Sequence, residues 1–442
     1  MLCRSKGFLS GHFSKKRTSG KAAFMLGQLC LSAFLLSGCN VIKKYHKVVD
    51  EKFAAGRDES GDSSSVLQGQ LTPVDRRPFI IHEIAQFNHP MAMSFLPDGS
   101  LLVAEKSGQL KLWHPDNKIG VIRNLPDVVS NGQGGLLDIA PHPDFEKNHL
   151  IYLSWTESEK LLKEKAALRN GESVDDLSGE DKSAMGAVIG RAELVCDNKG
   201  GGRLAGLSVI WRQEPKTEGD VNFGARMTFA PDKSLFISSG DRSQPAAAQD
   251  MSINLGKIVR ITDIGRIPAD NPFNGSSFLK SQIWTSGHRN PLGMAFSPDG
   301  RLWENEIGQN GGDKLNLIQK GANYGWPIVT AAAEPSSSTA TTPTHPEFTK
   351  PKWSWSTSLV PSSLLFYTGN LFPEWKGNAF IGGLASQMLV RMEIKGDKVR
   401  EADRWPMGHP VRDVAQGSDG ALWVLYDDNK GGKLIRLAPP GR

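Results

Sequence analysis

The sequence predicts an all-β protein with the architecture of a six-bladed β-propeller. Its 442 residues include 47 glycines and 26 prolines, and its short apolar runs are separated by turn signals, which favours strands and tight turns over long helices. A Pro-Asp or Asp-Gly turn followed by a short apolar strand recurs along the chain. Six such units over about 360 residues leave about 60 residues each, which is enough for four strands and their loops.

The repeated turn and strand occurs in five clear copies and one degenerate copy. The clear copies are LPDGSLLVAEK from residue 96, HPDFEKNHLIYLSW from 142, APDKSLFISSGD from 230, SPDGRLWENEIG from 297 and GSDGALWVLYDD from 417, and the degenerate copy is EWKGNAFIGGL from 374. Pro-Asp and Asp-Gly favour tight hairpin turns, and radial repetition of sheets protects most of their edges. The alternative fold is a pair of β-sandwiches whose turns share this chemistry.

The N-terminal segment has the features of an export signal. Residues 1–38 carry six basic residues and no acidic residue, and their apolar stretch FMLGQLCLSAFLL is short for a membrane span. The stretch ends in Leu36-Ser37-Gly38-Cys39, which resembles the lipobox of bacterial lipoproteins. We therefore expect a lipoprotein signal peptide over 1–38 and lipidation of Cys39, with translation starting at Met1 or Met25. An uncleaved anchor helix and a plain signal peptide are the alternatives.

The N-terminal segment accounts for the positive net charge of the chain and contains two of its four cysteines. The net charge of +5 belongs to residues 1–38 and the rest of the chain carries −1, so nucleic-acid binding loses its main support. After maturation only Cys39 and Cys196 would remain, so no intrachain disulfide is expected despite export. Cys196 is predicted to be a small buried apolar residue at a strand end. Residues 39–78 are predicted to be a flexible tether that holds the lipoprotein at a membrane, facing the periplasm or the cell surface.

The propeller is predicted over residues 79–442, with two insertions. ESEKLLKEKAALR, residues 157–169, combines strong helix formers with Glu-to-Lys spacing, which predicts a solvated helix in an insertion near 157–185. TAAAEPSSSTATTPTHPEF, residues 330–348, has low complexity and predicts a mobile loop at 330–350.

Polar residues collect in the segments that we expect to connect the blade strands. Loops on one face of a propeller converge on its axis, so Gln133, Arg289, Asn290 and Arg412 are predicted to line one pocket rich in arginine and amide donors. His142 and His288 lack a partner at metal-ligand spacing, and structural hydrogen bonding is expected of them. No zinc-type spacing, P-loop, dinucleotide fingerprint or Gly-x-Ser-x-Gly motif occurs, so hydrolysis and nicotinamide chemistry lack support in the sequence.

Five ordered strings resemble the soluble quinoprotein glucose and aldose sugar dehydrogenase family. They are GQGGLLDIAPHPDF; FGARMTFAPD with the following GDR, LGKIVRI and IPADNPF; GHRNPLGMAFSPDGRLW; GGDKLNLIQKGANYGWP; and VRDVAQGSDGALWVL. The resemblance covers about residues 80–438. It implies a six-bladed propeller that binds pyrroloquinoline quinone (PQQ) and calcium in a central pocket and oxidises the anomeric carbon of an aldose to a lactone. It also implies a sugar or polyol substrate and a soluble or membrane-bound electron acceptor.

The resemblance assigns roles to positions of this sequence. The reaction needs a base for the sugar hydroxyl proton, a quinone carbon that accepts hydride, and cations that stabilise the developing charge. The resemblance implies that Asp241 orients the base, that Arg289 and Asn290 lie beside the quinone, that Arg412 and Gln133 contact the cofactor pocket, and that Gly308 and Gln309 offer calcium-binding carbonyls.

Several of the implied functional positions carry a different residue in this chain. The family's catalytic histidine falls at Asn222, which has no basic nitrogen. Asn222 therefore cannot supply general-base catalysis, which contributes about a hundred- to ten-thousand-fold to the rate. A lysine over the cofactor is replaced by Ala385 and an arginine by Pro410, and Ile307 and Gln309 alter the calcium loop.

Three functions therefore stay open. The first is a PQQ-dependent sugar dehydrogenase in which another residue, or a water held by Asp241, takes the proton. The second is a non-catalytic propeller that binds a carbohydrate, a peptide or a surface partner. The third is hydrolysis by a calcium-activated water, with Asp241 and Asp313 as the carboxylates.

Overall fold

A computed structural model describes residues 76–170, 183–330, 345–428 and 431–441, all within one compact unit of the chain. The predicted signal peptide, Cys39 and nearly all of the tether lie outside these residues. None of the described helices has the length and hydropathy needed to cross a bilayer.

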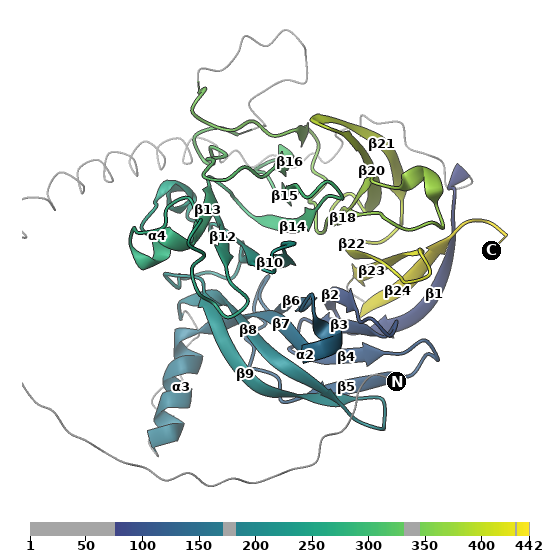
Figure 1. The fold of residues 1–442 in the computed structure, drawn as a ribbon, viewed down its shortest axis with the longest axis horizontal. Helices are drawn as coiled ribbons and strands as arrows, with labels where there is room; N and C mark the ends of the chain where they lie inside the picture. The colour runs from purple at the N-terminus through teal and green to yellow at the C-terminus, as the bar shows by residue number, and fades with distance from the viewer. Residues whose placement is uncertain (1–75, 171–182, 331–344, 429–430, 442) are drawn as a thin grey trace, which may run out of the picture. The chain divides into compact units, whose positions relative to one another are not determined.

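Antiparallel strands are arranged in sheets around a common centre (Figure 1). The first sheet has eight strands. It combines β2 (Pro90–Phe95), β3 (Leu101–Glu105), β4 (Leu110–Trp113) and β5 (Ile119–Arg123) with β6 (Leu136–Pro141), β7 (Leu150–Ser158), β8 (Met185–Cys196) and β9 (Gly202–Arg212). Its two antiparallel halves are joined by a short parallel pairing of β5 with β9.

The other sheets have four strands each. The second sheet contains β10 (Gly224–Phe229), β11 (Leu235–Ser239), β12 (Lys257–Ile261) and β13 (Ile283–Ser286), and the third contains β14 (Pro291–Phe296), β15 (Leu302–Glu306), β16 (Asp313–Leu317) and β17 (Trp353–Trp355). The fourth contains β18 (Leu365–Phe366), β19 (Ala379–Gly382), β20 (Met388–Lys395) and β21 (Lys398–Pro406). The last contains β22 (Val411–Gln416), β23 (Leu422–Asp428), β24 (Gly431–Ala438) and β1 (Ile80–Phe87).

The innermost strands form a ring. β2 contacts β6, and the contacts continue through β10, β14, β18 and β22 back to β2. Each of these strands begins at the centre of the molecule, so the loops before them converge there. The fold is therefore propeller-like, as the repeated turns predict.

The two ends of the described chain meet in the last sheet. β1 pairs with β24 in antiparallel register from Ile80 opposite Ala438 to Phe87 opposite Gly432. Phe79, just before β1, is buried and packs edge-on against Trp405 at 5.4 Å and Trp375 at 6.4 Å between ring centroids. An N-terminal strand thus completes a sheet built from C-terminal strands and closes the ring.

The repeated turn has one geometry in four sheets. In the first, Leu96 N donates to Ser100 O at 2.8 Å and Gly99 N donates to Leu96 O at 3.0 Å. The same pair of bonds recurs at 230–234, 297–301 and 417–421. The residue in the Gly99 position has a φ of about +80° where it is glycine and +66° at Lys233, which explains why the motif favours Asp-Gly. At His142 the turn is extended by α2 (Phe145–Asn148).

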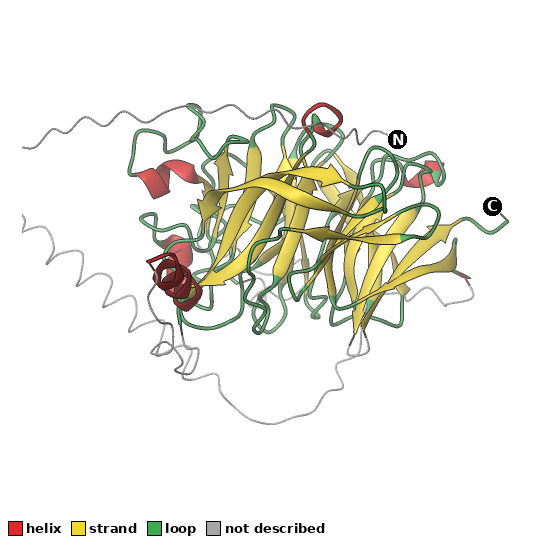
Figure 2. Cartoon of the chain, turned by 90° about the horizontal axis from the view of Figure 1, so that it is seen from below, coloured by secondary structure: helices red, strands yellow, loops and turns green. Residues whose placement is uncertain are grey.

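The few helices lie at the ends and edges of the strands (Figure 2). They are α2, α3 (Glu159–Asn170), α4 (Phe278–Gln282) and the 3-10 helices η3 (Pro245–Gln249) and η5 (Pro373–Trp375). The inserted helix α3 begins at Glu159 rather than at 157, because Glu157 is a buried residue of β7 whose carboxylate accepts a hydrogen bond from Arg212 at 2.8 Å. Residues 171–182 of the predicted insertion and 331–344 of the predicted loop lie outside the described residues.

The cores lie between neighbouring sheets. One cluster joins Phe87, Leu101 and Trp113 to Trp423 and Leu425, so it connects the first sheet to the last. Cys196 ends β8 as expected, but it is half-buried rather than fully buried, because the strand end lies at the margin of its cluster.

Candidate active site

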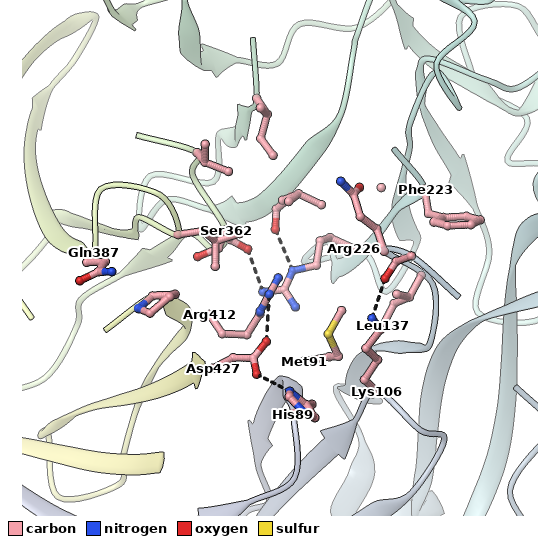
Figure 3. Close-up of a pocket in the computed structure, with 18 residues that line it drawn as sticks. His89, Met91, Lys106, Leu137, Phe223, Arg226, Ser362, Gln387, Arg412 and Asp427 are labelled. Atoms are coloured by element: carbon pink, nitrogen blue, oxygen red, sulfur yellow. Dashed lines mark hydrogen bonds and ion pairs between the residues drawn. The ribbon is translucent and has the colours of Figure 1, made fainter. Parts of the chain in front are cut away.

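A cavity of about 670 Å³ lies among the starts of the inner strands (Figure 3). This volume is in the range of small-molecule sites. The wall combines three cations and one carboxylate with a histidine, amides and apolar groups. It consists of His89, Met91, Lys106, Gly132, Gln133, Leu137, Phe223, Gly224, Arg226, Leu292, Ile307, Val360, Ser362, Leu384, Gln387, Pro410, Arg412 and Asp427.

Irregular backbone brings polar side chains to this wall. The pairing register of five inner strands shifts near their first residues, between Pro90 and Ala92, Leu136 and Asp138, Gly224 and Met227, Pro291 and Gly293, and Val411 and Asp413. Such bulges redirect side chains and are frequent beside active sites. The strands therefore direct apolar side chains into the core, while the residues at their starts supply polar side chains to the cavity wall.

The segment 219–223 is held by the loop that follows β11. Arg242 donates to the carbonyls of Gly219 and Val221, and its guanidinium lies 3.6 Å from the centre of the Phe223 ring. Burial lowers the pKa of Arg242 to about 10. Phe223 forms part of the cavity wall, so residues 219–223 form part of the rim of the cavity and are not a turn remote from it.

The structure brings Asn222 and Asp241 together. The Asn222 side-chain amide donates to Asp241 Oδ1 at 3.0 Å, and Asn222 N donates to Gln133 Oε1 at 2.9 Å. Trp326 Nε1 donates to Asp241 Oδ2 at 2.8 Å, and Ser243 N donates to Oδ1 at 2.9 Å. Burial raises the pKa of the Asp241 carboxyl, while these donors and the charge of Arg289 oppose the rise. Asn222 is buried, and its amide is committed to Asp241 as a donor.

Arg289 and Asn290 connect the same rim to the predicted calcium loop. Asn290 Oδ1 accepts from Gly224 N at 3.2 Å, and its carbonyl accepts from Ile307 N at 3.2 Å. The Arg289 guanidinium donates to Ile307 O at 3.3 Å and lies 5.6 Å from the Trp326 ring. Ile307 is part of the wall, whereas Gly308 and Gln309 are not. Arg289 and Asn290 were predicted to line the pocket, but neither is a wall residue, because the guanidinium is bonded to Ile307 O and the amide oxygen to Gly224 N.

Asp313 fixes the loop that is predicted to bind calcium. Its Oδ1 accepts from Gly308 N at 2.8 Å, and its Oδ2 accepts from Leu359 N at 2.7 Å and Val360 N at 2.8 Å. Burial raises the pKa of Asp313. Asp241 and Asp313, the two carboxylates required for calcium-assisted hydrolysis, are thus each occupied by protein N–H donors, which weighs against that hypothesis.

A buried acidic group lies behind Arg289. Ligand atoms of His288, Glu304 and Glu306 lie within 4.8 Å of one another, which makes this the candidate metal group among the residues that the structure describes. However, Asn316 Nδ2 donates to Glu304 Oε2 at 2.8 Å and to Glu306 Oε1 at 3.3 Å, and Glu306 Oε2 accepts from Arg289 N at 2.7 Å. We interpret the group as a hydrogen-bonded support for the Arg289 loop.

Both histidines considered from the sequence have structural roles. Burial lowers the pKa of His288 to about 3, so the ring is neutral, and its Nε2 is 2.9 Å from Thr285 Oγ1. His142 Nδ1 accepts from Asp144 N at 3.0 Å inside the extended turn. Neither residue belongs to the cavity wall.

The floor of the cavity is an ion-pair hub that sequence reasoning missed. Arg226 donates to Asp138 Oδ1 at 3.1 Å, to Asp413 Oδ1 at 2.8 Å and to the carbonyls of Leu292 and Ser362 at 2.8 and 3.3 Å. Burial raises the pKa of Asp138 to about 6; Arg226 opposes the rise and Asp413 adds to it. The available signal was a charged residue at the third position of β6, β10 and β22.

Arg412 lies inside β22 rather than in a loop, which corrects the expectation from the sequence, and Asp413 follows it in the same strand. The bulge at the start of β22 allows Arg412 to face the cavity while Asp413 reaches Arg226. Asp427 accepts from Arg412 through Oδ2 at 3.1 Å, and burial lowers the pKa of Arg412. Arg412 Nε is buried and has no hydrogen-bond partner in the described structure.

The wall contains three further polar groups that were not predicted. His89 Nδ1 lies 3.1 Å from Asp427 Oδ1, and Lys106 Nζ donates to Gly132 O at 2.6 Å (Figure 3). All three come from segments that begin or end a strand, and the repeat that contains Lys106 and Asp427 marks their strands rather than a site. Of the altered family positions, Ile307 and Pro410 form part of the wall, whereas Ala385 is exposed beside the wall residue Leu384.

Fold and site together define a propeller-like β-protein with a small-molecule cavity at its centre, rich in arginine and lysine. The sequence model of the glucose/sorbosone dehydrogenase family matches residues 87–436. The chain therefore belongs to the glucose/sorbosone dehydrogenase family, which confirms the resemblance seen in its motifs.

Individual relatives agree with this assignment. Aldose sugar dehydrogenase YliI of Escherichia coli K12 is 36% identical over 362 residues, covering 80% of this chain and 91% of that protein. The apo crystal structure of the soluble aldose sugar dehydrogenase from Escherichia coli matches with a TM-score of 0.71 at 34% identity, covering 82% of this chain and 99% of that one. The PQQ-bound aldose sugar dehydrogenase of Streptomyces coelicolor matches with a TM-score of 0.62 at 25% identity, covering 81% and 98%.

Proposed function

We propose that this protein is a sugar dehydrogenase built on a six-bladed propeller, which uses PQQ and calcium to oxidise the anomeric carbon of an aldose to a lactone. The observation that carries the proposal is the convergence of Gln133, Lys106 and Arg412 on one central cationic cavity. Arg289 contacts its wall through the bond to Ile307 O. The ring of inner strands supports the six-bladed architecture, and the family membership supports the reaction class.

The donor groups of the cavity fit a planar quinone that carries several carboxylates. Arg412 offers a buried Nε without a protein partner, and Lys106 offers an ammonium group at the same wall. Such cations bind carboxylates strongly because their hydrogen bonds are charge-assisted. When bound, PQQ supplies the carbon that accepts hydride.

The chain's own residues would bind the cofactor, orient it and polarise its quinone. Arg412 and Lys106 would hold carboxylates, and Gln133 keeps the 219–223 rim in place through its bond to Asn222 N. Arg289, positioned by Glu306 and Ile307, would place positive charge beside the quinone oxygens, where negative charge develops. Gly308 and Gln309 would contribute carbonyl oxygens to calcium, which prefers oxygen ligands.

A second candidate function is a non-catalytic propeller that binds a carbohydrate or a protein partner. The observation that favours it is the state of Asn222, whose amide is a hydrogen-bond donor to Asp241 and cannot act as a base. Ala385 and Pro410 also remove two cations from positions that the family resemblance marks.

PQQ should raise the melting temperature of the purified protein in a calcium-dependent manner. A ligand at a hundredfold excess over its dissociation constant adds about 2.7 kcal/mol to the free energy of unfolding. Dye reduction with a panel of aldoses then separates the two functions. A shift with turnover supports the dehydrogenase, and a shift without turnover supports a binding role. The absence of any shift at saturating PQQ would exclude the cofactor and with it the proposed reaction.

We further propose that the protein is an exported lipoprotein, anchored through Cys39 and facing the periplasm or the cell surface. Replacing Cys39 by Ser should abolish incorporation of labelled palmitate and release the protein from the membrane fraction, because the thiol is the site at which the lipid is attached. Cys196→Ser is the matched control and should remain anchored. Labelling that persists in Cys39→Ser would rule out this anchor.

A further inference from the structure

We propose that His89, oriented by Asp427, is the general base of this active site in place of Asn222. The inference rests on the proposed function, since it assigns the residue that takes the proton from the sugar hydroxyl. It arises from the second polar pair of the cavity, which is far in sequence from the Asn222–Asp241 pair.

The geometry of the pair defines which nitrogen is basic. His89 Nδ1 lies 3.1 Å from Asp427 Oδ1. An ionised carboxylate only accepts hydrogen bonds, so Nδ1 carries the hydrogen and Nε2 carries the lone pair. A carboxylate partner also stabilises the imidazolium that forms when Nε2 takes a proton.

Asp427 connects His89 to the cofactor side of the cavity. Its other oxygen, Oδ2, accepts from Arg412 at 3.1 Å, so one carboxylate lies between the imidazole and the guanidinium (Figure 3). The other charged groups of the wall are Lys106, whose ammonium is bonded to Gly132 O, and Arg226, which is paired with Asp138 and Asp413. The bond to Arg412 fixes the direction of the carboxylate and thereby the orientation of the His89 ring.

The backbone of His89 is held in place from both sides. Its φ is +47°, which is uncommon for a residue other than glycine, and its carbonyl accepts from Lys106 N at 2.9 Å. Asn88 N donates to Glu105 Oε1 at 2.8 Å, and Pro90 follows directly. Asn222, with a φ of +54°, stands in a similar place before β10. The two residues thus occupy related positions before two inner strands of the ring.

The other polar groups near the cavity are unsuited to this role. Asn222 has no basic nitrogen, and Asp241 already accepts from three donors. Among the described residues that form the wall, His89 is the one imidazole, and imidazole is the side chain whose ordinary pKa lies near neutrality. Its side chain is 46% exposed, so a sugar can reach it.

The proposed step conserves atoms and electrons. His89 Nε2 takes the proton of the anomeric hydroxyl as the O–H bond breaks, and the C1 hydrogen leaves as hydride to the bound quinone, which is the two-electron oxidant. The former hydroxyl oxygen forms a double bond to C1, which gives the lactone. The imidazolium then loses its proton to water, which restores the base.

His89→Gln tests the assignment, because glutamine can keep a hydrogen bond to Asp427 but offers no basic nitrogen. With calcium and PQQ, kcat should fall about a hundred- to ten-thousand-fold, while the PQQ-induced thermal shift stays within the error of the wild type. The acid limb of the kcat–pH profile should also disappear. His82→Gln, at an exposed position on β1, is the matched control and should keep both kcat and the pH profile.

Two further variants give independent readouts. In Asp427→Asn, the NMR signals of the His89 ring nitrogens, assigned by their absence in His89→Gln, should report a mixture of the two tautomers, because an amide can both donate and accept whereas the carboxylate only accepts. In the double variant His89→Gln/Asn222→His, kcat should recover at least tenfold over His89→Gln. These readouts decide the question even if one of the single variants is poorly folded.

The outcomes are distinct. A wild-type protein that binds PQQ but turns over no aldose would overturn the proposed function and this inference together. Wild-type turnover with a kcat for His89→Gln within threefold of it would overturn the inference alone. A loss of the PQQ thermal shift in a folded His89→Gln would also overturn it, since His89 would then bind the cofactor rather than the proton.

Discussion

Arg226→Met should lower the free energy of unfolding by about 3–5 kcal/mol at pH 7, because removing one partner of a buried ion pair leaves uncompensated charge. Arg226 joins Asp138, Asp413 and two backbone carbonyls at the floor of the cavity. Met has a similar length and keeps the apolar contacts of the stem, so the loss reports the missing charge and hydrogen bonds. Urea unfolding at equilibrium measures it.

The loss of stability in Arg226→Met should increase with pH. Burial raises the pKa of Asp138 from 3.8 to about 6, and Arg226 opposes this rise, so its removal raises that pKa further. The folded variant then holds the Asp138 proton up to higher pH than the unfolded chain does. Its stability relative to wild type must therefore fall as pH rises through about 6 and above, where the wild-type carboxyl has lost its proton and that of the variant has not. The difference between variant and wild type should be smaller at pH 5 than at pH 8.

Arg301→Met is the matched control for Arg226→Met. Arg301 also pairs with two aspartates, Asp299 at 2.7 Å and Asp397 at 3.0 Å, but these partners are largely exposed to solvent. Water screens such pairs, so the stability should change far less. Similar losses for the two variants, or a loss for Arg226→Met that is independent of pH, would contradict the assignment of a buried hub.

Phe79→Ala should lower the free energy of unfolding by about 3–5 kcal/mol, the range for truncating a buried aromatic residue. Phe79 is 4% exposed and packs against Trp375, Trp405 and the core between the last two sheets. Its loss leaves a cavity and weakens the attachment of β1, the strand that closes the ring. Differential scanning calorimetry, together with hydrogen exchange of β1 and β24, measures both effects.

Phe278→Ala is the matched control for Phe79→Ala, because Phe278 is 66% exposed at the start of α4. Its removal should leave stability nearly unchanged. Exchange in β1 and β24 should rise in Phe79→Ala only. If exchange rises equally across all sheets, Phe79 contributes to general stability and has no special role in closure.

Part of the candidate site could be predicted from residues that are close in sequence. The strings around Gln133, Asn222, Asp241 and Arg289 each mark a loop, and the structure brings these loops to one rim. Asp138, Arg226 and Asp413 could not be predicted, because a charged residue in a strand has no local signature of its partner. Residues 138 and 226, and 226 and 413, are separated by 88 and 187 positions.

The sequence by itself determined the strand-and-turn repeat, the resemblance to the family and the presence of asparagine at position 222, because each is a local pattern or a residue identity. Turn geometry depends on a few neighbouring residues, so the Asp-Gly motif predicts it directly. Only the tertiary structure decided that β1 completes the sheet of β22–β24, that Arg226 joins several inner strands, and that His89 lies against Asp427, 338 positions away. These contacts depend on ring closure, which brings residues together through packing over the whole chain.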